Sequence, residues 1–275
     1  MTNPLLDTSS LPRFDDIAPE HVVPAIEQLI KRNRAHLDAL LSNGQHAQFD
    51  SVVIPFEEMD HELSRVWSPV RHLQSVLGSK DWRDAYNAAL PLLTEYGTDL
   101  SQNADLQRAF AKVKGSLDTD ASAASRSLVD HALRDFHLAG VDLPDAEKAR
   151  FKAIMQDLAA TQASFEHNVQ DASDAWTLHI TDEKELTGVP DQAQKRAAEE
   201  ATTRQLDGWV LTLDYPTYDA ILTHAENRDL REQLYRAWST RGSDQGSKAD
   251  WDNSGNIEKI MALRLSLIHI SEPTR

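Results

Sequence analysis

The string in this chain that comes nearest to a zinc-binding HExxH motif is His61-Glu62-Leu63-Ser64-Arg65. An HExxH helix presents two histidines, at positions i and i+4, to one zinc ion, and its glutamate activates the zinc-bound water. Arg65 stands where the second histidine belongs, and a cation at that position would repel the metal. Because the predicted helix around His61 has an apolar opposite face, we interpret His61 as a solvated helix residue.

A second near-miss begins at Asp118, where the sequence starts like a calcium-binding loop. Ala123 occupies the turn position that requires glycine, and Val129 stands where the bidentate glutamate belongs. The Ala-rich residues 118–125 are therefore interpreted as an ordinary loop.

His131, Asp135 and His137 lie close together in the sequence. On a helix, His131 and Asp135 share a face while His137 is turned away, so we interpret them as surface hydrogen-bonding residues. The sequence also contains no glycine-rich phosphate loop and no nucleophile elbow. We therefore assign no catalytic, cofactor-binding or metal-binding residue in this chain.

Composition and charge exclude several classes of function. The 275 residues carry a net charge of -16, which argues against nucleic acid or an anionic membrane surface as a partner. There is no cysteine, so disulfides, thiol nucleophiles and cysteine-based zinc sites are excluded. The N-terminus lacks the pattern of a secretory signal, and no apolar run is long enough to span a membrane.

Apolar residues recur at spacings of three and four through most of the first 173 residues, which predicts an entirely helical region. Residues 1–17 lack this period and are predicted to form an extended arm. Pro69 should kink or split its helix, and Pro144 should occupy the first position of the longest one. Gly44 and Gly140 are expected to end helices. The predicted helices cover approximately residues 19–43, 55–77, 81–96, 104–114, 121–138 and 144–173.

The period then changes to two. Trp176, Leu178 and Ile180 alternate with polar residues, and residues 209–213 alternate in the same way, which predicts two short strands. Between them we expect a short helix ending at Leu186 and a polar helix over residues 191–206, and a further helix over 216–224 follows. The predicted fold class is mainly α, with a small two-stranded β element near residues 176–213.

Residues 227–253 are the most specific stretch, since they combine an amphipathic helix over 227–240 with a polar loop. Arginines crowd this helix and its end beside leucines and aromatic residues. They could form a solvated face, a wall or ion pairs, and the pattern alone does not distinguish a substrate contact from a scaffold contact. The arginines are Arg228, Arg231, Arg236 and Arg241.

Several strings, in one order and spacing, resemble the thimet oligopeptidase-like zinc metallopeptidases. The resemblance covers residues 1 to about 264 without a break. It is carried by MTNPLL, APEHVVPAIEQ, SPVRHLQSV, LPLLTEY, ALRDFHLAGVDLP, FEHNVQDASDAWTLHITDEKELTGVP, GWVLTLDYPTYDAIL, NRDLREQLYRAWSTRGSDQG and WDNSGNIEKIMALR.

The resemblance implies a mostly helical enzyme of the cytoplasm, a monomer, whose narrow channel admits short unfolded peptides. It also implies zinc held by an HExxH helix and a later glutamate, which this chain lacks. Family members would bind zinc through residues outside this chain, and this chain would bind none. We accordingly predict that the chain alone is inactive. The domains implied are an N-terminal helical domain over 1–173, a connecting segment over 174–223 and the start of the catalytic domain over 224–264.

Residues 265–275, LSLIHISEPTR, depart from the family pattern. They resemble the in-frame translation of a sequencing adaptor, and their apolar residues are not expected to continue the preceding helical stripe. We interpret residues 1–264 as a truncated family member with a non-native tail; the alternative is a natural short paralogue. The alternative function is a helical module that binds peptides or a partner helix without hydrolysis. Helices meant to pack on a further domain should also leave apolar surface exposed.

Overall fold

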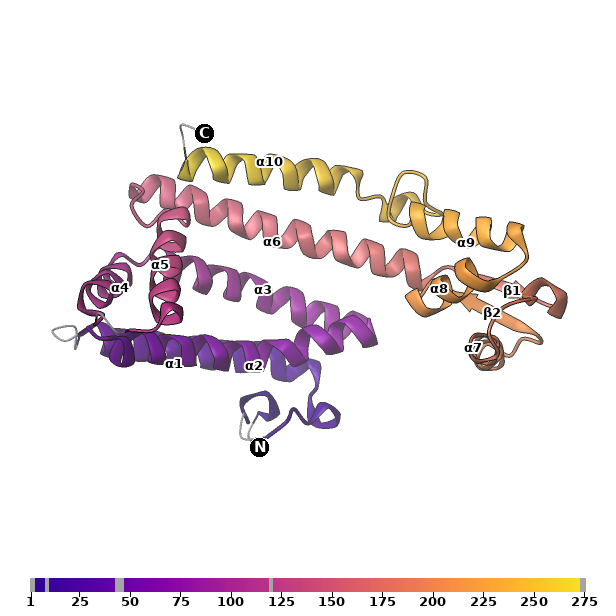
Figure 1. Cartoon of the computed structure of the whole chain (residues 1–275), viewed down its shortest axis with the longest axis horizontal. Helices are drawn as coiled ribbons and strands as arrows, with labels where there is room; N and C mark the ends of the chain where they lie inside the picture. The colour runs from indigo at the N-terminus through magenta and orange to yellow at the C-terminus, as the bar shows by residue number, and fades with distance from the viewer. Residues whose placement is uncertain (1–2, 8–9, 43–46, 119–120, 273–275) are drawn as a thin grey trace. The chain divides into compact units, whose positions relative to one another are not determined.

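A computed structural model of the chain describes residues 3–7, 10–42, 47–118 and 121–272 (Figure 1). It divides into two compact units, Met1–Ala160 with Ala262–Arg275 (unit 1) and Thr161–Met261 (unit 2). The elements are the helices α1 (Val22–Ser42), α2 (Ile54–Leu77), α3 (Lys80–Ser101), α4 (Ala104–Ser116), α5 (Ala123–Leu138), α6 (Asp145–Asp174), α7 (Asp191–Thr203), α8 (Tyr215–His224), α9 (Arg228–Thr240) and α10 (Ser254–Ser271), and the strands β1 (Thr177–Ile180) and β2 (Trp209–Thr212).

In unit 1, α1, α2 and α3 contact one another and α4 packs against α5. Phe110 on α4 is fully buried, and its ring makes edge contacts with Phe56 and Phe136, both at 5.6 Å between centroids. Trp67 of α2 stacks on Tyr86 of α3 at 5.0 Å. The predicted apolar stripes therefore meet in the core, as a mainly α fold requires.

Side-chain caps explain where several of these helices begin. The side chains of Ser79, Asn103 and Ser122 accept hydrogen bonds from backbone N–H groups in the first turns of α3, α4 and α5. Each cap satisfies a donor that has no partner within the helix. Gly78 ends α2 in the left-handed conformation, with φ 57°, where a residue with a side chain would be strained.

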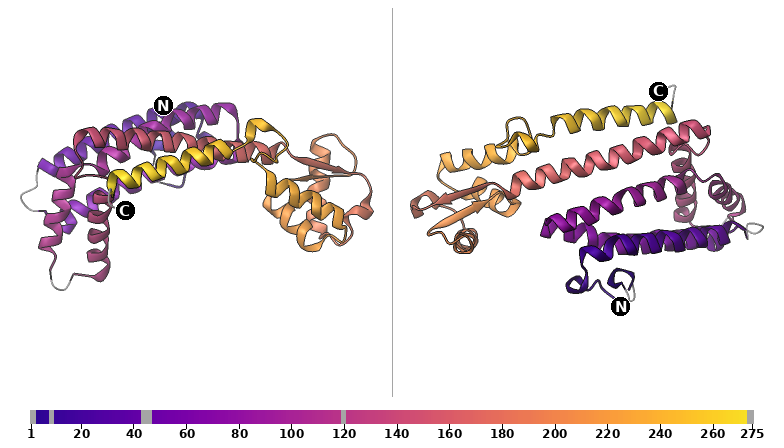
Figure 2. Two further views of the ribbon diagram at one scale, coloured as in Figure 1. Left: turned by 90° about the horizontal axis from the view of Figure 1, so that it is seen from above. Right: turned by 180° about the vertical axis from the view of Figure 1, so that it is seen from behind.

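Unit 2 contains the small β element. β1 and β2 pair antiparallel, with Leu178 opposite Leu211 and Ile180 opposite Trp209. Helix α7 contacts β2, and α8 packs against α9; Figure 2 shows these elements gathered around the two strands. Their shared core consists of Ile180, Leu186, Val189, Ala197, Leu211, Leu213, Ile221, Ala225, Leu230 and Leu234. The predicted fold class, mainly α with a two-stranded β element, is confirmed.

Several predicted boundaries were wrong by a few residues. α6 begins at Asp145, so Pro144 precedes the helix and its carbonyl accepts hydrogen bonds from the N–H groups of residues 147 and 148. α7 ends at Thr203 rather than near residue 206, because Gln205 adopts φ 59°. α3 continues to Ser101. Pro69 lies inside α2 without splitting it.

Of the two ends of the chain, the N-terminal one also differs from expectation. The arm over residues 1–17 contains two 3-10 turns, Pro4–Leu6 and Phe14–Asp16, and buries Leu5. Residues 1–2 and 8–9 and the predicted stop at Gly44 lie outside the described residues. α10 runs unbroken through Ser271. Its exposed residues Ile257, Met261, Leu265 and Ile268 follow helical spacing, while Ile270 is buried. The expectation that the apolar residues after 264 do not continue the preceding stripe cleanly stays a prediction. None of the described helices is long and apolar enough to cross a membrane.

Candidate functional site

A cavity of about 390 Å³ lies within unit 2, in the stretch that the sequence marked as most specific. Its walls come from the end of α6, the start of β1, the second half of α9 and the loop over residues 241–251. The residues that give it chemical character are Trp176, Arg236, Thr240, Arg241, Lys248 and Trp251. A volume of this size is within the range of small-molecule sites.

Arg241 directly follows α9, and its guanidinium lies 3.6 Å from the centroid of the Trp238 ring. Its Nη1 donates a hydrogen bond of 2.6 Å to the carbonyl oxygen of Trp238. Trp238 in turn stacks on Tyr218 of α8, with 4.5 Å between centroids. Burial lowers the pKa of Arg241, but a guanidinium remains protonated at neutral pH. This arrangement holds a positive charge at the cavity wall.

Two further cations line the cavity. Lys248 places its Nζ 4.4 Å from the centroid of the Trp251 ring, which holds the ammonium by a cation–π contact. Arg236 is exposed and pairs with Glu232 one turn earlier on α9, at 2.9 Å. None of the described residues that line the cavity is acidic. The site can therefore attract an anion.

The loop that carries Arg241 and Lys248 is fixed by Asn253, which is 1% exposed. The side-chain Nδ2 of Asn253 donates to the carbonyl oxygen of Phe165 at 3.1 Å, and its Oδ1 accepts from Asn168 at 3.0 Å and from Asn256 at 2.7 Å. Its backbone N–H donates to the carbonyl oxygen of Gly242 at 3.0 Å. Asn253 thus joins both ends of the loop to α6.

Gly242 permits the approach of these segments. It adopts φ 64°, and a Cβ at this position would lie 3.2 Å from Asn253 Nδ2 and 3.3 Å from Val169 Cγ2. The left-handed conformation and the close neighbours together favour glycine.

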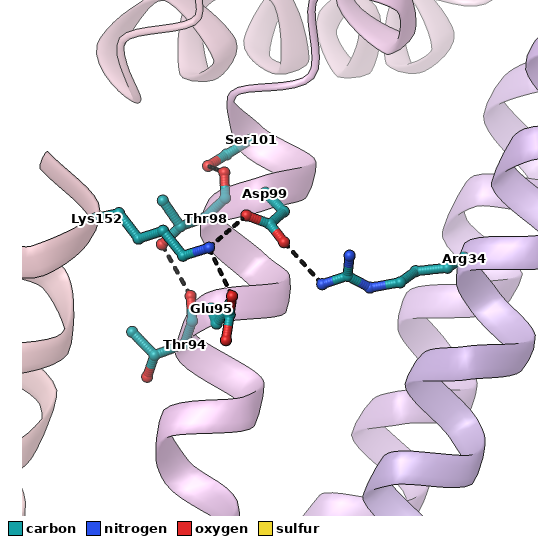
Figure 3. Close-up of polar contacts among 7 residues, drawn as sticks. All are labelled: Arg34, Thr94, Glu95, Thr98, Asp99, Ser101 and Lys152. Atoms are coloured by element: carbon teal, nitrogen blue, oxygen red, sulfur yellow. Dashed lines mark hydrogen bonds and ion pairs between the residues drawn. The ribbon is translucent and has the colours of Figure 1, made fainter. Parts of the chain in front are cut away.

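Unit 1 contains a separate charged cluster, formed by Arg34, Glu95, Asp99 and Lys152 (Figure 3). Lys152 Nζ on α6 lies 2.8 Å from Glu95 Oε1 and 2.9 Å from Asp99 Oδ1 on α3. Arg34 Nη2 on α1 lies 2.7 Å from Asp99 Oδ2. Hydrogen bonds to Glu95 and then to Asp99 raise the pKa of Lys152. Because each charge already has a partner, we interpret this cluster as a connection between three helices.

The residues of the HExxH-like string do not meet in a metal site. His61 is exposed on α2, as expected of a solvated residue. Glu62 pairs with Arg32, and Arg65 Nη2 donates to the carbonyl oxygen of Ser10 at 2.8 Å. No group of three or more His, Asp or Glu that could hold a metal occurs among the described residues.

The other near-misses are also surface features. His137 Nδ1 lies 3.1 Å from Asp142 Oδ2, and both side chains are exposed. Asp135 Oδ1 instead accepts from Arg134, so the predicted surface residues His137 and Asp135 bond to neighbours outside the group of three. Ser122 caps α5 one residue before the turn position of the calcium-like loop. Residues 119 and 120 of that loop lie outside the described residues.

Comparison with known proteins identifies the helical region. Residues 26–148 match the family model of the Neurolysin/Thimet oligopeptidase N-terminal domain. The position of the domain agrees with the resemblance seen in the sequence, and it covers α1 to α5 apart from the first turn of α1.

Several curated proteins match nearly the whole chain. Oligopeptidase A of Escherichia coli (strain K12) is 41% identical over 272 residues, which is 98% of this chain and 40% of the relative. Oligopeptidase A of Haemophilus influenzae is 40% identical over 97% of the chain and 39% of the relative. The probable cytosolic oligopeptidase A of Arabidopsis thaliana is 32% identical over 96% of the chain and 38% of the relative. The chain thus spans about two fifths of the length of these relatives.

Sequence reasoning missed the cavity, although it identified the stretch that forms most of it. Trp176 precedes Arg236 by 60 positions, and no spacing rule connects a residue after a long helix to a loop after another. The local signal was the sequence Trp238-Ser239-Thr240-Arg241, in which an arginine follows a tryptophan at helical spacing.

Proposed function

We propose that this chain is the N-terminal part of a zinc-dependent metalloendopeptidase of the oligopeptidase A type, which hydrolyses short peptides. The observation that supports this proposal is the 41% identity to oligopeptidase A along 98% of the chain. The similarity continues past the N-terminal domain through β1, β2, α9 and the loop that follows. A shared helical domain alone would be weaker support, since a fold can host many functions.

We further propose that zinc and the groups that activate water lie outside this chain in the complete enzyme. The sequence contains no HExxH motif, and the described residues include no cluster suited to a metal. Within this proposal the described residues contribute walls for the substrate and no step of hydrolysis. The 275-residue chain by itself would not cleave peptides.

The proposal includes short peptides as substrates, a monomeric state and the cytoplasm as location. The words "probable cytosolic" in the name of one relative support the last point, while another relative is named as organellar. The division at residues 173, 223 and 264, and the non-native origin of residues 265–275, remain predictions.

A hydrolysis assay with a quenched fluorescent peptide tests the proposal. The purified chain with added zinc is expected to give no turnover above buffer. A chimera that joins residues 1–264 to the remaining part of E. coli oligopeptidase A is expected to cleave the peptide, and a chelator should abolish that activity. The same chimera with glutamine in place of its HExxH glutamate is the matched inactive control.

Two results would overturn the proposal. One is zinc-dependent cleavage by the 275-residue chain alone. The other is a chimera that is folded by circular dichroism, binds zinc and still fails to cleave peptides that intact E. coli oligopeptidase A cleaves under the same conditions.

The alternative is a module that binds peptides without hydrolysis. The observation that favours it is the cationic cavity, which is complete within unit 2. Under this alternative the chain would bind peptides, whereas the chimera would be inactive.

A further inference from the structure

We propose that the cavity beside Arg241 binds the C-terminal carboxylate of a short peptide. That the carboxylate belongs to a peptide rests on the proposed function. The location of an anion site in this cavity rests on the geometry of unit 2 alone.

The charges that line the cavity contrast with those of the whole chain. The chain has a net charge of -16, yet this cavity is lined by Arg236, Arg241 and Lys248 and by no acidic residue among those described. The nearby carboxylates do not themselves line the cavity: Asp244 accepts a hydrogen bond from Gln245, Asp252 accepts from Ser254, and Glu232 pairs with Arg236. A pocket of one sign in an oppositely charged protein concentrates ligands of the opposite sign.

Arg241 is the residue best placed to recognise a carboxylate. It is half-buried, and within the described part of the chain it forms no ion pair with a carboxylate. Its guanidinium lies over the Trp238 ring, 3.6 Å from the centroid, and Nη1 donates to the Trp238 carbonyl oxygen. The Nε and Nη2 donors make no hydrogen bond within the described residues, so they are available to a ligand. A fixed planar guanidinium favours carboxylate oxygens because it can donate two parallel hydrogen bonds.

Lys248 would add charge without fixed geometry, because among the described residues its exposed ammonium is held by the Trp251 ring alone. The indoles of Trp176 and Trp251 also line the cavity. They offer apolar surface beside the cations, which suits the side chain next to a terminal carboxylate. Inorganic phosphate shares the charge but could not use this apolar surface.

Intrinsic tryptophan fluorescence of the 275-residue chain can measure binding, since Trp176 and Trp251 line the cavity. The ligands are acetyl-Ala-Ala-Phe with a free carboxylate, the same peptide as its C-terminal amide, and inorganic phosphate. We expect the acid to bind at least about tenfold more tightly than the amide, the scale of a charge-assisted hydrogen bond. We expect phosphate to bind more weakly than the acid.

Arg241→Gln should remove the preference for the acid over the amide, and Lys248→Gln should weaken acid binding by a smaller factor. Arg228→Gln is the matched control, because Arg228 is an exposed arginine at the start of α9 and does not line the cavity. If circular dichroism shows that Arg241→Gln does not fold, the proposal is tested with Lys248→Gln, which changes an exposed side chain.

The proposal would be overturned by equal affinity for acid and amide, by equal effects of Arg241→Gln and Arg228→Gln, or by phosphate binding more tightly than the peptide. If Arg241→Gln is misfolded, the proposal would be overturned by a Lys248→Gln variant that binds the acid as tightly as the wild-type chain. These outcomes are separate from failure of the peptidase proposal, which would appear as an inactive chimera whatever the chain binds.

Discussion

Replacement of Asn253 by alanine should destabilise unit 2 more than any single hydrogen bond in it would suggest. The substitution removes the donor to Phe165 and the acceptor for Asn168 and Asn256. Alanine at position 253 can still donate the backbone hydrogen bond to the carbonyl oxygen of Gly242. The change therefore isolates the side-chain amide that joins the loop to α6.

The loss in free energy of unfolding depends on whether each group that bonded to Asn253 finds another hydrogen-bond partner in the variant. A buried polar group that loses its partner costs about 1–3 kcal/mol. The carbonyl of Phe165 keeps its partner within α6, whereas the amides of Asn168 and Asn256 are half-buried and reach water only in part. We therefore take the low end of the range for two groups, which gives about 2–3 kcal/mol. With a urea slope of about 1–3 kcal/mol per molar, the midpoint should fall by about 0.7–3 M.

Urea unfolding followed by tryptophan fluorescence measures this loss, because Trp176, Trp209, Trp238 and Trp251 all lie in unit 2. The matched control is Asn87→Ala, which removes the same atoms from an exposed position on α3 and should change stability by less than about 0.5 kcal/mol. Equal midpoints for the two variants would refute the assignment of Asn253 as the anchor of the loop.

Four further substitutions test other parts of the structure, each by urea unfolding against the wild-type chain. Leu234→Ala empties a fully buried position and should cost about 2–5 kcal/mol; a cost below 1 kcal/mol would contradict its place in the core. Gly242→Ala should cost about 1–2 kcal/mol, because its φ of 64° is unfavourable for alanine; a gain would contradict this. For Asp214, burial alone would raise the pKa, but hydrogen bonds from Thr212 and Thr217 outweigh burial and lower it. Asp214→Ala should therefore cost about 1 kcal/mol at pH 7, and the difference should vanish as pH falls below about 4; a difference that grows in acid would contradict it. The pKa of Lys152 is raised, so Lys152→Met should cost up to about 1 kcal/mol near neutral pH, and the difference should shrink above about pH 10; a pH-independent difference would count against the ion pairs.

Much of the fold could be predicted because the helices carry their own signals. Apolar residues at spacings of three and four predicted the helices, and alternation of apolar and polar residues correctly predicted β1 and β2. The errors in the prediction lie at helix boundaries, where the backbone conformation of a single residue decides where the helix ends. The turn at Gln205, a residue other than glycine with φ 59°, carries no signal in composition, and it ends α7 earlier than the polar pattern suggested.

The candidate site was less predictable because its parts come from separate elements. Arginine-rich α9 could be recognised, but its role depends on which residues face the cavity, and that depends on the path of the loop over residues 241–253. The path is set by the buried Asn253, whose side-chain hydrogen bonds to α6 span more than 80 residues of sequence. An asparagine in a polar loop gives no indication of such an anchor.

The charged cluster of unit 1 has a consequence for the order of folding. Glu95 and Asp99 are four residues apart near the C-terminal end of α3, where like charges repel and acidic side chains oppose the helix dipole. Lys152 and Arg34 supply the compensating charges from α6 and α1. We therefore expect the final turns of α3 to be weak as an isolated helix and to gain stability when α1 and α6 dock. In kinetic terms, we expect this end of α3 to form late in folding, although its sequence has a helical pattern.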